Sequence, residues 1–156
     1  MKFTKLAVLG LVAAISSTAF ADAPAADPVA KAIKFRQSGY QFLAWNSGRI
    51  KDALAAPQYD KDEVIKAANA IQAIANSGMG KLFVAGSDKG KGWKETEVKA
   101  DLFTKGDRVK EVAGNFAKEA NELAKVAATG DAKAVKVQYG KLTESCKACH
   151  KDFKKD

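Results

Sequence analysis

The chain of 156 residues carries 26 basic and 18 acidic side chains, which gives a formal net charge of +8 at pH 7. Its lysines and arginines are interspersed with acids, without an aromatic-basic stripe or a nucleic-acid motif, so we expect a solvated basic surface and no nucleic-acid partner. Alternatively, the positive charge steers the protein toward acidic redox partners. Two cysteines and one histidine are too few for the usual zinc site or catalytic triad.

The first 21 residues have the composition of a secretory signal peptide. Two lysines precede an apolar run over residues 6–15, and residues 19–21 form a small-x-small cleavage site. The apolar run is too short for a comfortable membrane span, and no later segment is long or apolar enough for one. We therefore expect residues 1–21 to be cleaved and residues 22–156 to form one periplasmic domain, with a net charge of +6 and no membrane attachment.

A first helix is predicted to begin at Pro28, because Asp27 is a suitable N-cap and proline is favoured at the first helical position. The apolar pattern then runs to about residue 55, with one stripe that recurs at alternating steps of three and four. This stripe consists of Val29, Ile33, Arg36, Tyr40, Leu43, Ser47, Ile50 and Leu54. Three aromatic residues beside it widen the apolar arc and serve either the core or a partner-facing surface. They are Phe35, Phe42 and Trp45.

Pro57 ends the first helix, and Asp60 is predicted to cap a second one that extends to about residue 76. The next stretch, residues 77–94, contains five glycines and several lysines. This composition predicts a long loop, which a compact domain rarely keeps without a use. We expect either a long crossover or a cover for the edge of a ligand.

A third helix is predicted over about residues 95–129, with apolar residues at seven-residue intervals and Gly130 at its end. The seven-residue set consists of Leu102, Val109, Phe116 and Leu123, backed by Ala113, Ala120 and Ala127. Asp131 can cap a fourth helix that runs through Phe153. Near-heptad patterning with short links predicts an all-α protein, an antiparallel four-helix bundle.

The last predicted helix contains Cys146-Lys147-Ala148-Cys149-His150. Two thiols three residues apart, followed at once by an imidazole, fit covalent attachment of haem c, because two thioethers fix the porphyrin and the histidine reaches the iron. A disulfide and a haem-free CxxC redox motif are the alternatives. On a helix, these side chains occupy adjoining arcs, so the porphyrin must lie against the bundle interior. The sixth ligand of the iron is then Met, Lys, Tyr or water, or the sixth position is empty.

Over essentially all of residues 22–156, the chain resembles the cytochrome c′ family, the class II c-type cytochromes. The likeness rests on residues 32–38 with their Arg-Gln pair, on residues 48–50 and 57–60, and on the terminal Cys-Lys-x-Cys-His. The resemblance implies a four-helix bundle, usually a homodimer, with a high-spin, five-coordinate haem c. It also implies binding of nitric oxide and carbon monoxide, with gas sequestration or electron transfer as the role.

Carried over by residue, the resemblance makes Cys146 and Cys149 the thioether anchors and His150 the axial ligand of the iron. Arg36 and Gln37 match positions at the haem, the arginine being suited to pair with a propionate.

Three further positions follow from the same resemblance. Tyr40 matches the residue that covers the vacant face of the iron, and Glu97, next to Thr96, approaches the haem edge. Lys154 stands where many relatives have an arginine near the proximal side.

Two other functions each require a residue that the sequence lacks. A low-spin electron carrier of the cytochrome c-556 type needs a methionine from the first helix, but there is none between Asp22 and Ser77. An enzyme such as a peroxidase needs a distal acid-base group, and the only histidine is proximal. We therefore expect no enzymatic activity, and the redox partner is unidentified from the sequence.

Overall fold

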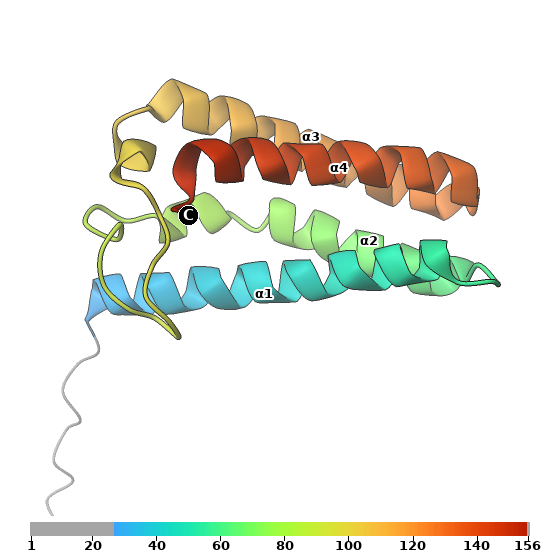
Figure 1. Ribbon diagram of the computed structural model, residues 1–156, viewed down its shortest axis with the longest axis horizontal. Coiled ribbons are helices and arrows are strands. Elements are labelled where there is room, and N and C mark those ends of the chain that lie inside the picture. The colour runs from blue at the N-terminus through green and yellow to red at the C-terminus, as the bar shows by residue number, and fades with distance from the viewer. Residues whose placement is uncertain (1–26, 156) are drawn as a thin grey trace, which may run out of the picture.

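The structure is a computed structural model that describes residues 27–155. Its four long helices run antiparallel to their neighbours in the chain and form a bundle (Figure 1). They are α1 (Pro28–Ala55), α2 (Lys61–Ala75), α3 (Gly106–Thr129) and α4 (Ala132–Phe153). The predicted all-α four-helix bundle is confirmed. The predicted signal peptide, residues 1–21, lies outside the described residues, and within those residues no helix has the length and hydropathy of a membrane span.

Local capping explains where three helices begin. The Asp27 carboxylate accepts a hydrogen bond from the Val29 amide at 2.9 Å, with Pro28 in the first turn. Asp60 and Asp131 cap α2 and α4 in the same way, each accepting from a backbone amide two or three residues later. Such caps satisfy amides that the helix itself leaves without partners. The predicted starts of these helices are therefore confirmed.

The main hydrophobic core occupies one end of the bundle, the end with the short α1–α2 and α3–α4 links. Its largest buried members come from all four helices: Ile50, Val64, Ile71, Leu123, Val135 and Leu142. Helix α1 packs on α2, α2 on α3 and α3 on α4, whereas α1 and α4 touch only weakly. Beyond Leu142, the C-terminal half of α4 and the N-terminal half of α1 therefore lie at the other end of the bundle, where the two helices contact each other only weakly.

The predicted third helix is wrong over residues 95–105, because α3 begins only at Gly106. Residues 97–99 instead pair with the end of α4: the Lys99 amide donates to the Phe153 carbonyl at 2.9 Å, and the Lys155 amide donates to the Glu97 carbonyl at 2.7 Å. Leu102 consequently lies in the short helix η2 (Ala100–Phe103). The seven-residue pattern also fails at Ala113, which is exposed.

The predicted long loop is confirmed, with a short helix η1 (Met79–Leu82) near its start. In Figure 1 this connection passes across the N-terminal half of α1, at the end of the bundle that the main core leaves open. The loop thus lies beside the half of α4 that carries the Cys-His motif.

Candidate functional site

Helix α4 carries both cysteines as free, half-buried thiols, and His150 follows as an exposed residue one turn before the helix ends. No disulfide joins them in this structure. Burial raises the pKa of both thiols, and for Cys149 the neighbouring Cys146 adds to this effect. Because a helix of 3.6 residues per turn sets positions i, i+3 and i+4 on one broad face, the two sulfurs and the imidazole share one surface of α4.

The imidazole of His150 is kept available as an electron-pair donor. Burial lowers its pKa, the positive charge of Lys154 lowers it further, and Glu97 opposes them. A neutral imidazole is the form that binds a metal. Glu97 itself pairs with Lys94 at 2.6 Å and with Lys154 at 3.3 Å, so the predicted edge residue lies beside the histidine, held by the pairing of residues 97–99 with the end of α4.

Tyr40 faces the cysteines from α1. Burial around its hydroxyl raises the pKa of Tyr40 to about 12, the thiols of Cys149 and Cys146 add to the rise, and Arg36 opposes it. The residue is still 43% exposed. The residues that the structure describes give its hydroxyl no hydrogen-bond partner, and its ring is in edge-to-face contact with Phe83.

Arg36 is 3% exposed, and its guanidinium anchors the loop to α1. It donates to the Ser87 hydroxyl at 2.7 Å, to the Ser87 carbonyl at 2.6 Å and to the Thr96 hydroxyl at 2.6 Å. It also lies over the Phe83 ring, 4.8 Å from the centroid. No carboxylate pairs with Arg36 among residues 27–155, although buried cations usually have an anionic partner.

Gln37 anchors a second part of the loop. Its side-chain oxygen accepts from the Trp93 amide at 2.7 Å, and its nitrogen donates to the Lys94 carbonyl at 2.9 Å. The backbones approach so closely here that a Cβ on Gly92 would lie 2.6 Å from the Lys34 amide nitrogen. Arg36 and Gln37 thus hold the loop against α1, a role that was not predicted from the sequence. The local signal of this contact is Gly92, because a residue with a side chain would not fit there.

The residues at this end of the bundle fit a haem c. Two thiols and an imidazole of lowered pKa lie on α4, and Tyr40 faces them from α1. Helices α1 and α4 pack together only weakly. The unpaired charge of Arg36 suits the carboxylate of a propionate. Within the described residues, no group of three or more His, Cys, Asp or Glu side chains forms a metal cluster.

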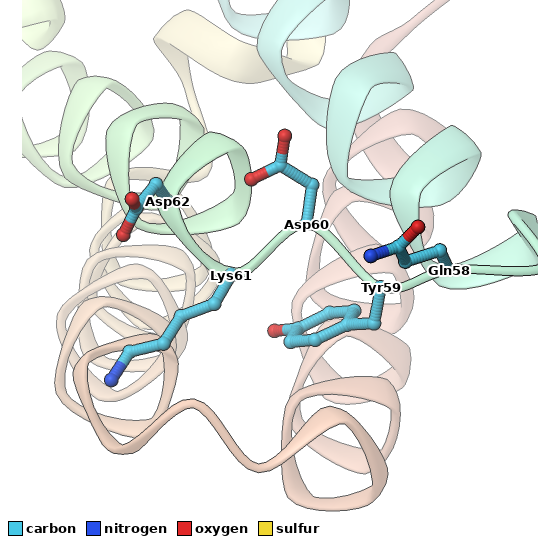
Figure 2. A pocket seen from close by; sticks show the side chains of 5 residues that line it. All are labelled: Gln58, Tyr59, Asp60, Lys61 and Asp62. Carbon is cyan, nitrogen blue, oxygen red and sulfur yellow. The ribbon is translucent and has the colours of Figure 1, made fainter.

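A separate hollow at the opposite end of the bundle contains none of the predicted site residues. It has a volume of about 600 Å³ and is lined by Gln58, Tyr59, Asp60, Lys61 and Asp62 (Figure 2). The Tyr59 hydroxyl is buried without a hydrogen-bond partner among the described residues. Burial raises the pKa of this phenol, and the charge of Asp131 adds to the effect. The hollow follows the α1–α2 link and contains no histidine or cysteine.

The fold and the Cys-His motif together define a c-type cytochrome built on a four-helix bundle. Residues 31–154 match the family model described as Cytochrome C'. The chain therefore belongs to the cytochrome c′ family, whose cofactor is haem c, and Cys146 and Cys149 fit its attachment motif.

Individual relatives agree with this assignment. The chain is 63% identical to cytochrome c′ of Rhodocyclus tenuis over 123 residues, which is 79% of this chain and 92% of that protein. The crystal structure of cytochrome c′ from Thermochromatium tepidum matches with a TM-score of 0.78 and 44% identity, covering 83% of this chain and 98% of that chain. A cytochrome c′ described as having a ligand-controlled dimer dissociation matches with a TM-score of 0.79 and 43% identity. The match covers 85% of this chain and 99% of that chain.

Proposed function

We propose that the protein is a periplasmic haem c protein with a high-spin, five-coordinate iron that binds nitric oxide and carbon monoxide and exchanges electrons, and that it is not an enzyme. When bound, haem c supplies an iron that takes up small gases and changes its oxidation state by one electron. The observation that carries the proposal is the contrast between α4 and α1 at this end of the bundle. Helix α4 offers a neutral imidazole, whereas α1 offers Tyr40, whose phenol has a pKa of about 12.

Each residue of the site has one task in this proposal. Cys146 and Cys149 would hold the porphyrin by thioether bonds, and His150, on the same face of α4, would serve as the iron ligand. Tyr40 would restrict access from α1 by the bulk of its ring and not by bonding, because a protonated phenol is a poor metal ligand near neutral pH. A small neutral gas would then have to move this ring. Arg36 supplies positive charge for a propionate, while Gln37 and Glu97 hold the loop at the edge of the site.

An enzymatic role lacks the groups that it would need. Peroxide or gas chemistry beyond simple binding requires a distal acid-base residue. The chain has one histidine, which α4 uses. The guanidinium of Arg36 is engaged by Ser87 and Thr96 on the loop, so it is not free to act as a proton donor.

The assembly that we propose is an isologous homodimer through α1. Phe42 and Trp45 are 50% and 58% exposed, and their rings stack on each other with centroids 5.5 Å apart. Exposed aromatic rings that lie side by side are typical of an interface between subunits. The relative with ligand-controlled dimer dissociation supports the proposal, because it is 43% identical to this chain.

The experiment is optical and magnetic spectroscopy of the purified holoprotein. We expect colour that acid-acetone does not extract, a high-spin resting spectrum, and a shifted spectrum when carbon monoxide is added to the reduced protein. A Cys146→Ser, Cys149→Ser double variant should be colourless. A low-spin resting spectrum that carbon monoxide leaves unchanged would instead favour an electron carrier of the cytochrome c-556 type.

A further inference from the structure

We propose that a surface of lysine and aromatic side chains beside the loop binds an acidic protein partner. The proposal rests on the proposed function, since such a partner would be the protein that exchanges electrons with the haem c. We call this region the Lys–Trp surface, and it surrounds a hollow of about 520 Å³. Its residues are Ala30, Lys31, Lys34, Phe35, Ser38, Lys91, Gly92 and Trp93.

Trp93 is the centre of the Lys–Trp surface, and it is both exposed and fixed. It is 57% exposed, but its indole nitrogen donates to the Ser38 hydroxyl at 2.7 Å and its backbone amide donates to Gln37 at 2.7 Å. The Lys34 ammonium lies over the indole, 4.0 Å from the ring centroid. An aromatic side chain that is already ordered loses little entropy on binding, which is how aromatic anchors of interfaces act.

The charge of the surface is uncompensated. Lys31, Lys34 and Lys91 make no ion pair with any residue that the structure describes, and none of the residues lining the hollow is acidic. The nearest ion pair along the chain uses Lys94, which Glu97 neutralises at 2.6 Å. Three free ammonium groups around an apolar centre attract carboxylates and favour a partner with acids around an apolar side chain.

A second copy of this chain does not fit the surface as well as an acidic partner does. An isologous contact would bring Lys31, Lys34 and Lys91 close to the same lysines of the other copy, and like charges facing each other are costly. The stacked pair of Phe42 and Trp45, further along α1, is apolar and suits the homodimer better. The two surfaces therefore serve two different contacts.

The Lys–Trp surface also lies next to the candidate haem site. Gln37, which holds the Trp93 amide, follows Arg36 in α1, and Glu97, beside His150, lies four residues after Trp93. A partner seated here is therefore close to the group with which it would exchange one electron, an exchange in which no bond forms or breaks.

Binding is tested with the mature holoprotein and two short peptides, one of glutamate and phenylalanine and one with the glutamates replaced by lysines. Nuclear magnetic resonance titration with the acidic peptide should shift the amides of residues 31–35 and 91–94, in a salt-dependent manner, and the basic peptide should not bind. A Lys34→Glu, Lys91→Glu variant should weaken binding by about tenfold or more. The matched control, Lys133→Glu with Lys136→Glu, changes the net charge equally on α4, and it should have little effect.

The aromatic anchor has its own matched control. Trp93→Ala should weaken peptide binding several-fold, whereas Val137→Ala, which removes exposed apolar surface from α4, should not. Oxidation of the reduced protein by hexacyanoferrate(III), an anion that accepts one electron, should slow more in the Lys34→Glu, Lys91→Glu variant than in its control.

Three results would overturn the proposal: shifts spread over the whole basic surface, equal effects of the two charge-reversed pairs, or a loss of the dimer in the Trp93→Ala variant. The last result would make a second copy the occupant. Failure of the proposed function has a different signature, because a colourless or low-spin protein is recognised from its spectrum before any peptide is added.

Discussion

Tyr40 and Phe83 meet edge to face, with ring centroids 6.3 Å apart and ring planes inclined by 61°. The other contact of Phe83 is the guanidinium of Arg36, which lies over its ring. The loop and α1 are thus joined at the residue that we expect to cover the iron. Displacement of the Tyr40 ring by a gas must break its contact with Phe83 or move a loop that Arg36 holds.

Phe83→Leu is therefore expected to ease displacement of Tyr40. An aromatic pair contributes about 0.5–1.5 kcal/mol beyond burial, so carbon monoxide should associate roughly two- to tenfold faster. Stopped-flow mixing of the reduced protein with carbon monoxide measures the rate. The same substitution made in a Tyr40→Ala protein should change nothing, because the contact is already absent. An equal acceleration in both backgrounds would mean that Phe83 acts independently of Tyr40.

Tyr40→Ala should have the larger effect on gas binding. Displacing a packed ring costs roughly 1–3 kcal/mol, so its removal should speed carbon monoxide and nitric oxide association by up to about a hundredfold if most of that cost lies in the barrier. The resting spectrum should stay high-spin, since Tyr40 covers the iron without bonding it. Unchanged kinetics would show that another group guards the sixth position.

The phenol of Tyr40 also predicts a pH dependence. Burial raises its pKa from 10.0 to about 12, so between these values the folded protein keeps a proton that the unfolded chain has lost. The folded state then binds more protons, and the free energy of unfolding must fall as the pH rises through this window. Urea unfolding at about pH 9 and about pH 11 measures the fall, which Tyr40→Phe should reduce. An identical fall in the variant would assign the alkaline loss of stability to other groups.

Arg36→Met is expected to destabilise the protein by about 2–4 kcal/mol, because it leaves the buried polar groups of Ser87 and Thr96 without their donor. The measurement is the free energy of unfolding in denaturant. Arg108→Met is the control, since it removes an exposed arginine that pairs with Glu111 and Asp152, and the loss there should be smaller. A loss for Arg36→Met no larger than for the control would contradict the anchoring role.

The parts of this fold that were predictable from the sequence are those fixed by neighbouring residues. The starts of α1, α2 and α4 follow from Asp27, Asp60 and Asp131, whose carboxylates bond amides two or three positions away. The Cys-His motif is equally local, because residues 146–150 lie on one helix.

The errors and omissions arise where the partner is distant in the chain. Residues 97–99 were predicted to be helical, but they pair with residues 153–155, which no local pattern reveals. Arg36 was predicted to lie at the haem, yet its partners Ser87 and Thr96 lie 51 and 60 residues away in the chain.

Phe42→Glu is expected to dissociate the proposed homodimer. The symmetry of an isologous contact would bring two buried carboxylates together, so the dimer dissociation constant should rise by roughly thirtyfold or more, equivalent to about 2 kcal/mol for a central anchor residue. Sedimentation velocity at micromolar concentration measures the mass. Val137→Glu is the matched control, because Val137 is an exposed apolar residue on α4, away from the stacked pair of Phe42 and Trp45. A wild-type protein that sediments as a monomer would contradict the proposed dimer. A dimer that Phe42→Glu leaves intact would show that the contact lies on another face, because two facing carboxylates cannot be buried without cost.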